Sequence, residues 1–480
     1  MAQKIIGRGK EQQELLDLYH SGRPEFVVVQ GRRRVGKTYL VRELLDGQMT
    51  FYHTGLSPAE VASETGGMLR MQLASFYSSL VRYGYQGAAP STWLEAFDML
   101  RDLLESRGSE ERLVVFIDEL PWMDTPRSFF ISAFEHFWNG WGAGRSNLML
   151  IVCGSATSWI NDKIINNKGG LYNRITAELI LMPFSLAECE QLYRYLGVSM
   201  DRYDQLQAYM ITGGIPYYLV MMDKKLSLAQ NIDQLFFAKN AKLKEEFTRL
   251  FHSLFTNPDD YLSVVRLLGK RRIGYTRKEI VEATTIAYGG GLTTILKALE
   301  ASGFIEAYTP YKGTSRDVRY RLIDPFCLFY THFLDTGRST DPRFWQNNLR
   351  QPALTAWRGF AFENVCSLHV EQIKQALGIS GVYTECSSWR SKRSAQGAQI
   401  DLVIDRADRV VNLCEMKFTA DDFCIDKACD AALRHKLTTF IEETNCRSSV
   451  HLTLVTTYSL VRNEYSSRVQ SVVTMDDLFR

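Results

Sequence analysis

The sequence lacks several features that would have fixed its class at once. None of its nine cysteines forms a C-x-x-C pair, so neither a zinc ribbon nor a disulfide framework is indicated. Apolar runs such as Leu148-Met-Leu-Ile-Val-Cys153 fall far short of the ~20 residues that a membrane helix needs. The net charge is only +2, so any contact with nucleic acid depends on local basic patches. The first residues also lack a signal segment, and we expect a soluble, cytoplasmic protein with reduced cysteines and no membrane contact.

A glycine loop near the N-terminus is the most informative stretch. Residues 24–38 have the pattern of a buried strand, a loop and a helix start, and four of them match G-x-x-x-x-G-K-[ST]. In this motif loop N–H groups surround the β-phosphate of a nucleotide, the lysine reaches the β- and γ-phosphates, and the threonine hydroxyl holds Mg²⁺. The motif predicts that ATP and Mg²⁺ bind at Gly31, Arg32, Arg33, Arg34, Val35, Gly36, Lys37, Thr38 and Tyr39, with Thr38 as a metal ligand.

A second apolar run, residues 112–117, ends in two acids, Asp118 and Glu119. Such a run is typical of a strand buried on both faces of a parallel sheet, and ligands bind at the carboxyl ends of these strands. We therefore expect Asp118 to hold Mg²⁺. We expect Glu119 to polarise the water that attacks the γ-phosphate.

Two further residues are candidates for the same reaction. A third buried strand ends at Ser155, and Ser155 or Thr157 is placed to bond the γ-phosphate or the attacking water; a serine that merely caps the strand is the alternative. Arg174 is a candidate to stabilise charge on the transferring phosphoryl group. An ordinary exposed loop arginine is the alternative there.

The order of these motifs resembles a known group of ATPases. Residues 5–16, with Arg8 and Glu11, are similar to the first segment of AAA+ and related STAND ATPases, although a plain amphipathic surface helix has the same pattern. The G-G-x-P turn that ends at Pro216 resembles the lid motif of STAND ATPases. From Arg8 to Tyr218 the chain looks like archaeal and bacterial AAA-family ATPases of the STAND-related clade. That resemblance implies ATP hydrolysis with Mg²⁺, a helical lid, nucleotide-dependent switching and assembly into homo-oligomers.

Residues 258–323 have the order helix, helix, helix, β-hairpin, which is typical of a winged helix-turn-helix. Lys312, Arg316 and Arg319 lie in or beside the hairpin loop. The third helix, residues 292–300, is not strongly basic, which weakens a direct reading of the major groove. Two roles therefore stay open: DNA contact through the wing, or binding of a protein partner.

The last part of the chain contains a second group of acids. Glu363 lies in a predicted helix, and residues 399–404 and 410–418 are predicted strands. Alternation places Glu415 and Lys417 on one face, where Asp401 is able to meet Glu415 if the strands form an antiparallel hairpin. Two carboxylates there would hold Mg²⁺, which lowers the pKa of a bound water, and Lys417 would support the developing charge.

This region looks like the PD-(D/E)XK nuclease fold, and it resembles the C-terminal domain of unknown function that often accompanies these ATPases. The resemblance carries catalytic roles to Glu363, Asp401, Glu415 and Lys417. A catalytically inactive fold or an ordinary Glu–Lys surface pair are the alternatives. Residues 389–393, which include two arginines and a lysine, are a candidate contact for a nucleic-acid backbone or else a solvated loop.

These expectations combine into an α/β chain with a P-loop parallel-sheet core and a C-terminal α/β domain like that of restriction endonucleases. The expected function is an ATPase coupled to a metal-dependent nuclease acting on DNA, in genome maintenance or defence. The alternative is a STAND-type regulator, switched by ATP and ADP, that binds DNA or protein and has an inactive C-terminal domain. The predicted domains are a P-loop core at 1–184, a helical lid at 185–257, a winged helix at 258–335, a connecting helical segment at 336–357 and the nuclease-like domain at 358–480.

Overall fold

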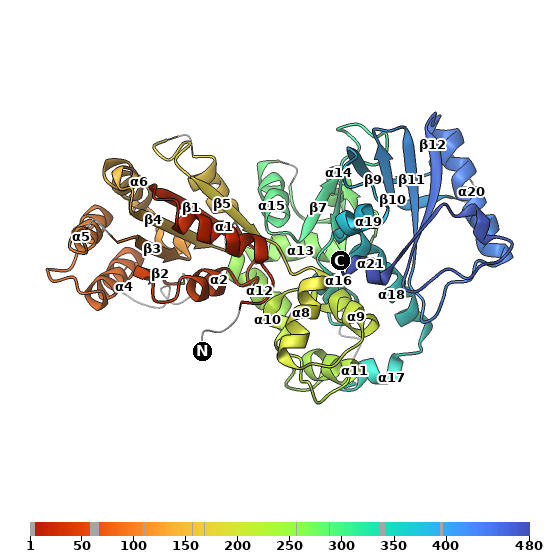
Figure 1. The fold of residues 1–480 in the computed structure, drawn as a ribbon, viewed down its shortest axis with the longest axis horizontal. Helices are drawn as coiled ribbons and strands as arrows, with labels where there is room; N and C mark the ends of the chain where they lie inside the picture. Colours follow the sequence, from red (N-terminus) through yellow and green to blue (C-terminus); the bar gives the residue numbers. More distant parts are fainter. Residues whose placement is uncertain are drawn as a thin grey trace. The chain divides into compact units, whose positions relative to one another are not determined.

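The chain forms two compact units, Met1–Pro183 and Phe184–Arg480 (Figure 1). None of the helices that the structure describes is long and apolar enough to cross a membrane. The structure is a computed structural model, and it describes residues 5–57, 67–108, 111–155, 157–167, 169–255, 257–287, 289–335, 341–393 and 397–480.

The first unit is built on a parallel sheet of five strands in the order β2-β3-β4-β1-β5. All residues of β1, β3 and β4 are buried, as expected for strands covered on both faces. Because β4 lies between β1 and β3, the carboxyl ends of these three strands meet at one edge. The strands are β1 (Glu25–Gly31), β2 (Met49–Thr54), β3 (Leu113–Asp118), β4 (Leu148–Gly154) and β5 (Ala177–Leu181).

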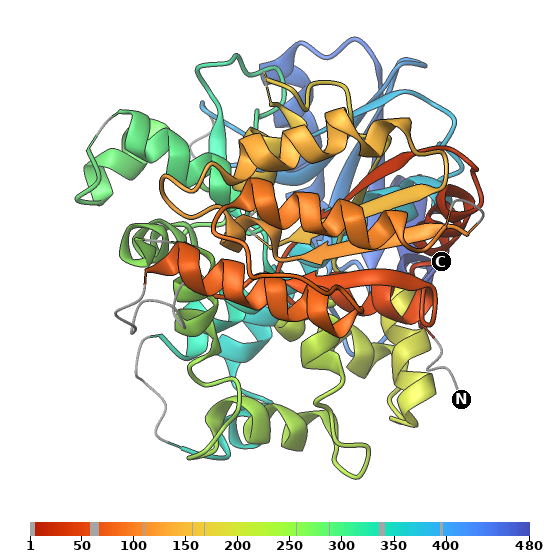
Figure 2. The same cartoon turned by 90° about the vertical axis from the view of Figure 1, so that its left-hand side faces the viewer.

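Helices α4, α5 and α6 pack on one face of this sheet, where they appear as the orange helices of Figure 2. Helix α5 has its N-terminus capped by the Thr92 side chain. The helices of this unit are α1 (Gly9–Tyr19), α2 (Lys37–Leu44), α4 (Met68–Arg82), α5 (Trp93–Glu105), η1 (Leu120–Met123), α6 (Phe130–Gly140), η2 (Gly142–Gly144), α7 (Thr157–Ile160) and η3 (Asn161–Ile165).

The second unit begins with the helices predicted to form a lid. Helix α9 ends at the two glycines of the G-G-x-P turn, and a Cβ at Gly214 would lie 2.2 Å from the Phe184 carbonyl oxygen. This helix packs against α16 and α18, so the predicted lid shares its core with later parts of the chain. The helices are α8 (Leu186–Leu196), α9 (Arg202–Thr212), α10 (Pro216–Leu219), α11 (Leu228–Ile232), η4 (Asp233–Phe237) and α12 (Glu246–Leu254).

The next segment contains every helix and strand predicted for it, and one more strand. The additional strand, β6, is two residues long and pairs with β8 in an antiparallel sheet of order β6-β8-β7. Thr276 forms a capping box with Glu279. The elements are α13 (Pro258–Leu268), β6 (Tyr275–Thr276), α14 (Arg277–Ala283), α15 (Gly290–Ala301), β7 (Ile305–Tyr308), β8 (Arg319–Leu322) and α16 (Pro325–Phe333).

The predicted connecting segment differs from the observed one at its end. Residues 336–340 lie outside the described part of the chain, and α17 (Phe344–Asn348) follows them. Helix α18 (Pro352–Leu368) then runs through the predicted domain boundary at residue 358. The helix starts early because Pro352 suits its first turn and no residue up to 358 breaks it.

The C-terminal part is a mixed sheet of order β13-β12-β11-β10-β9. Strands β9, β10 and β11 are antiparallel neighbours, whereas β11, β12 and β13 run parallel. Helix α18 packs against β11 and α20 against β12 (Figure 1). The elements are α19 (Val370–Ala376), β9 (Thr384–Arg390), β10 (Gln399–Arg406), β11 (Val410–Lys417), α20 (Lys427–Thr444), β12 (Ser449–Thr456), η5 (Ser466–Arg468), β13 (Ser471–Thr474) and α21 (Met475–Leu478).

The interpretation of residues 389–393 as a loop is wrong for its first two residues, which end strand β9. Trp389 is buried, and its ring lies 5.3 Å from that of Phe440 on α20. The tryptophan is therefore part of the core between sheet and helix, not a free surface for nucleic acid.

Candidate functional sites

The glycine loop begins at a residue that has no room for a side chain. Gly31, the last residue of β1, has a φ of 145°, and a Cβ there would lie 2.3 Å from the carbonyl oxygen of Leu181 on β5. Gly36, with a φ of 93°, is the N-cap of α2. Both glycines of the motif therefore adopt backbone conformations that other residues rarely take.

Lys37 is buried in the first turn of α2. Its Nζ donates to the carbonyl oxygens of Gly31, at 2.9 Å, and Arg32, at 3.0 Å. Burial lowers the pKa of Lys37, while Cys153, Glu119 and Asp118 act in the opposite direction. The ammonium group is thus held over the loop by the loop's own backbone.

The first segment of the chain is fastened to this loop. Arg8 is buried, and its Nη2 donates to the carbonyl oxygen of Val35 at 3.2 Å, while Nη1 lies 3.7 Å from Glu11. This contact attaches the segment to the glycine loop and distinguishes it from a plain surface helix, the alternative given by its sequence pattern. Among the other predicted loop residues, Arg32 and Val35 are buried, Arg33 and Arg34 are half-buried, and Tyr39 is exposed.

Asp118 is buried at the end of β3, and three donors share its carboxylate. The Thr38 hydroxyl donates to Oδ2 at 2.7 Å, and the Glu119 N–H donates to Oδ1 at 2.9 Å. The thiol of Cys153, the penultimate residue of the neighbouring strand β4, also donates to Oδ1. Burial, together with the Asp118 charge, raises the pKa of Cys153 well above its usual value, so the thiol keeps its proton.

The predicted pair of metal ligands is therefore in contact, because the oxygens of Thr38 and Asp118 lie side by side. One carboxylate and one hydroxyl suit Mg²⁺ bound to a nucleotide, which takes its other ligands from phosphates and water. Sequence reasoning missed Cys153, although its place near the end of β4, beside β3, was a usable signal.

Glu119 and Ser155 are also in contact. The Ser155 hydroxyl donates to Glu119 Oε1 at 2.9 Å and its N–H donates to Oε2 at 3.1 Å. Glu119 has a left-handed backbone conformation, with a φ of 46°. Ser155 thus holds the carboxylate of Glu119, and the side chain of Thr157 lies outside the described part of the structure.

Arg174 is exposed on the turn that leads into β5. In the parallel pairing of β1 with β5, Val27 lies opposite Ala177, while Gly31 lies opposite Leu181. Arg174 precedes Ala177, so it lies at the amino end of the sheet. The glycine loop of the same chain is at the carboxyl end.

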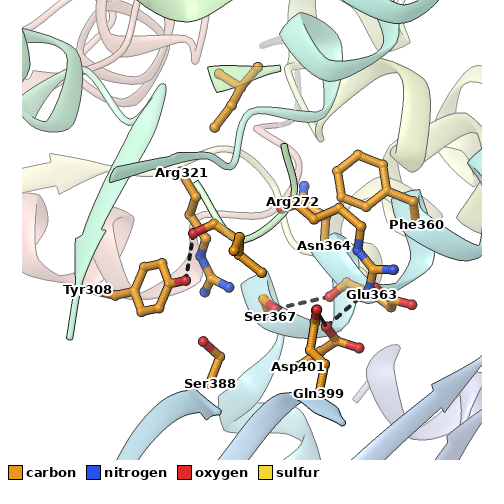
Figure 3. Close-up of a pocket in the computed structure, with 12 residues that line it drawn as sticks. Arg272, Tyr308, Arg321, Phe360, Glu363, Asn364, Ser367, Ser388, Gln399 and Asp401 are labelled. Atoms are coloured by element: carbon orange, nitrogen blue, oxygen red, sulfur yellow. Dashed lines mark hydrogen bonds and ion pairs between the residues drawn. The ribbon is translucent and has the colours of Figure 1, made fainter. Parts of the chain in front are cut away.

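In the C-terminal part, Glu363 and Asp401 come together around an arginine that sequence reasoning missed. Arg272, in the turn between α13 and β6, forms ion pairs with Glu363 on α18 and, at 3.0 Å, with Asp401 on β10 (Figure 3). The Gln399 side chain donates to Asp401 at 2.7 Å. The pairing of β10 with β9 shifts register between Ile400 and Val403, and this bulge re-aims Asp401.

Glu415 pairs with the predicted Lys417 and with a second lysine that was not predicted. Its carboxylate lies 2.9 Å from the Lys417 ammonium, as the strand pattern suggested, and 2.7 Å from that of Lys436 on α20. Burial disfavours the charged carboxylate, but the two lysines outweigh it and lower the pKa of Glu415. Burial opposes the charged ammonium of Lys417, but Glu415 and, more weakly, Asp401 raise its pKa.

Strands β10 and β11 form the antiparallel hairpin that the prediction required, with Leu402 opposite Cys414. The ion pairs of the acids are with cations: Asp401 and Glu363 pair with Arg272, and Glu415 pairs with two lysines. Over the described ranges, no three His, Cys, Asp or Glu side chains gather closely enough to hold a metal ion.

The hairpin loop of the predicted wing lies on the C-terminal sheet. The Tyr311 N–H donates to the Ser388 carbonyl oxygen at 2.8 Å, and Lys312 donates to the Thr444 carbonyl oxygen. Arg319 contacts the Gly274 carbonyl oxygen at 3.3 Å. Two of the three predicted wing bases are therefore engaged inside the protein, and Arg316 is exposed.

Comparisons with known proteins place the first site within a recognised domain. Residues 6–222 match the family described as an ATPase domain predominantly from Archaea. An uncharacterized protein of Methanocaldococcus jannaschii is 23% identical over 428 residues, which cover 86% of this chain and 87% of that protein.

Among solved structures, the Walker-type ATPase of Pyrococcus abyssi is 18% identical, with a TM-score of 0.46 over 68% of this chain and 96% of that one. The ORC2 protein of Aeropyrum pernix is 15% identical, with a TM-score of 0.39 over 70% and 96%. The glycine loop, Asp118, Glu119 and Ser155 all lie within the matched residues 6–222, and this match supports nucleotide binding by an ATPase domain of archaeal type.

Proposed function

We propose that this protein hydrolyses ATP with Mg²⁺ at the glycine loop and couples this reaction to a metal-dependent, nuclease-like C-terminal domain that acts on DNA. The observation that carries the ATPase part is the contact between the Thr38 hydroxyl and the Asp118 carboxylate beside the buried Lys37. These are the groups that an ATP–Mg²⁺ complex requires, and they come from the first turn of α2 and the end of β3, which are far apart in the sequence.

In this proposal each group has one role. Thr38 and Asp118 would hold Mg²⁺, and the bound ion would supply positive charge for the phosphates of ATP. Lys37 exchanges its bonds with two loop carbonyls for bonds with phosphate oxygens. Glu119 polarises the attacking water, and for this it has to turn away from Ser155, which is then free to bond the γ-phosphate. Binding and hydrolysis of ATP are therefore separable steps.

The test uses two variants with different expected defects. Lys37→Ala should abolish binding of a fluorescent ATP analogue, whereas Glu119→Gln should bind it and release no phosphate. Lys163→Ala, which removes an exposed lysine from the same unit, is the matched control. A Lys37→Ala protein that hydrolyses ATP at the parental rate would refute this assignment.

The nuclease part of the proposal is supported by the order of elements. Helix α18, strands β9 to β11, helix α20 and strand β12 follow the order expected of the PD-(D/E)XK fold, with Glu363, Asp401, Glu415 and Lys417 at the expected elements. The donors are carboxylates, as Mg²⁺ prefers, but cations occupy each of them. A bound metal would lower the pKa of a water, and Lys417 would stabilise the developing charge.

Cleavage of linear, circular, single-stranded and branched DNA with Mn²⁺, with and without ATP, tests this part. We expect cleavage by the parent and at least about a hundredfold loss in Asp401→Ala and Lys417→Ala, because the metal and charge support are removed. Arg350→Ala, which removes a charge from an exposed position outside the site, is the control. Cleavage that survives both changes would exclude these residues as the catalytic group.

A second function, a nucleotide-switched regulator with an inactive C-terminal domain, is favoured by one observation. Each carboxylate of the C-terminal group is paired with a cationic side chain, as in a purely structural cluster. In this reading the elements from α13 to β8 form a winged helix that binds DNA or protein. It predicts ATP-dependent binding without cleavage, and equal binding in the ATP, ADP and nucleotide-free forms would exclude it.

A further inference from the structure

A pocket in the second unit lies between the turn after α13, helix α18 and strand β10 (Figure 3). Arg272 contributes its guanidinium group from the turn, and Glu363 and Asp401 contribute their carboxylates from α18 and β10. The acids are the more enclosed side, with 18% and 21% of their side chains exposed, against 41% for Arg272. A half-exposed cation therefore covers two largely buried anions.

We propose that Arg272 is a built-in cation that closes the C-terminal acidic site and competes with divalent metal for Glu363 and Asp401. This inference rests on the proposed nuclease-like site, and it adds the regulation of that site. A metal ion binds the two carboxylates only when the turn that carries Arg272 has withdrawn.

The neighbouring arginines are paired with other acids, so Arg272 is the arginine that contacts Glu363 and Asp401. Arg321 lies 2.7 Å from Glu306, and its guanidinium lies over the Tyr308 ring. Arg271, the neighbour of Arg272, pairs with Glu279 at 2.7 Å on its own domain. Both arginines are neutralised within the segment from α13 to β8, whereas Arg272 reaches out of it.

The charges favour exchange for a divalent ion. The two carboxylates share the one guanidinium in contact with them, Gln399 adds only a neutral donor, and the Lys417 ammonium interacts with Asp401 more weakly. An oxygen-seeking divalent cation neutralises both carboxylates at once. The arginine delays this exchange because its ion pair must break first.

A second contact holds the closed arrangement. The hairpin loop between β7 and β8 is bonded to strand β9 through the Tyr311 N–H and to the end of helix α20 through the Lys312 ammonium. The Tyr311 ring also packs at 5.1 Å from Phe440. The segment that supplies Arg272 is thus attached at two places, and release of the hairpin loop frees Arg272 to withdraw.

The test is a titration of the full chain with Mn²⁺ in the absence of nucleotide. Binding is measured as the loss of the electron paramagnetic resonance signal of free Mn²⁺. We expect Arg272→Ala to tighten Mn²⁺ binding by about tenfold, because the competing cation is gone. Arg272→Gln serves as a second variant that keeps a polar side chain in case the alanine variant does not fold. Arg350→Ala, a loss of the same charge at an exposed position outside the hairpin, should bind Mn²⁺ like the parent.

The double variant Arg272→Ala/Asp401→Ala tests whether the tighter Mn²⁺ binding occurs at this site. In this variant the increase in Mn²⁺ affinity should disappear. Mn²⁺ affinity that is unchanged in both Arg272 variants, or a gain that persists without Asp401, would overturn the role of Arg272. The same samples are assayed for DNA cleavage. Tighter Mn²⁺ binding by the Arg272 variants without DNA cleavage would support the role of Arg272 and exclude the nuclease activity. Cleavage by the parent, with the same Mn²⁺ affinity in parent and Arg272 variants, would support the nuclease activity and exclude the role of Arg272.

Discussion

The carboxylate of Asp118 shows how one residue is positioned by neighbours that no motif contains. Its Oδ2 accepts from Thr38, within the glycine-loop motif, but its Oδ1 accepts from the buried Cys153 thiol. Without this donor Oδ1 keeps only the Glu119 N–H, so the carboxylate rotates more readily away from the Thr38 hydroxyl. Cys153 is thus a positioning residue for the proposed metal ligand.

We therefore predict that Cys153→Ala raises the Mg²⁺ concentration for half-maximal ATP hydrolysis by about tenfold, as removal of an outer partner of a metal ligand commonly does. Cys153→Ser keeps a donor and should restore most of the affinity for Mg²⁺. Phosphate release across an Mg²⁺ titration at saturating ATP measures the effect, with the buried Cys189→Ala as control. Identical Mg²⁺ curves for parent and Cys153→Ala would contradict the prediction.

Gly31 gives a prediction that depends on backbone geometry alone. An alanine Cβ would lie 2.3 Å from the Leu181 carbonyl oxygen, in a backbone conformation with a φ of 145°. Gly31→Ala should lower the free energy of unfolding by about 1–3 kcal/mol and weaken ATP binding, because β1 and β5 must separate or the loop must shift. Urea denaturation measures the change. Gly9→Ala, where a Cβ meets no atom within 4 Å, should be close to neutral.

At the scale of elements, the strands of the first unit were predictable because their signals are local. β1, β3 and β4 are rich in apolar residues; β1 and β3 end at Gly31 and Asp118 of the candidate site, and β4 ends one residue before Ser155. Strand β9 was not predictable in this way. It is an edge strand whose residues are mostly exposed or half-buried, so its sequence has no alternation of apolar and polar residues.

Trp389 is the buried residue of that strand, and it anchors β9 to α20 through Phe440. Trp389→Ala should lower the free energy of unfolding by about 3–5 kcal/mol, because it leaves a large cavity. Trp389→Phe keeps an aromatic contact and should cost less. Chemical denaturation followed by circular dichroism measures both, and an alanine variant as stable as the parent would contradict the assignment of Trp389 to the core.

The two candidate sites also differ in whether local sequence signals or tertiary packing bring their residues together. Residues of the ATP site lie at strand ends, where a parallel sheet brings them together by rule. The partners of the C-terminal acids come from elsewhere: Arg272 from a turn in another segment, and Lys436 from the middle of α20. Their pairing depends on tertiary packing, so residue types at strand ends predicted Glu363, Asp401, Glu415 and Lys417 but not what holds each of them.

At the scale of the whole molecule, the position of Arg174 relates ATP hydrolysis to assembly. The residue is exposed at the amino end of β5, at the opposite end of the sheet from the glycine loop of its own chain. If Arg174 stabilises the transferring phosphoryl group, it does so in a neighbouring copy. The catalytic unit would then be an oligomer, and the rate per chain would rise with protein concentration.

Mixing two inactive variants tests this arrangement. Arg174→Ala keeps its own loop and should lose about 10³-fold or more in hydrolysis rate, the usual effect of removing such an arginine. Lys37→Ala has no working loop but keeps Arg174. Because each variant has what the other lacks, a mixture should recover hydrolysis that neither shows alone, measured as phosphate release against mixing ratio. A mixture as inactive as its parts, or full activity of Arg174→Ala by itself, would exclude action between subunits, since in either case Arg174 serves no neighbouring site.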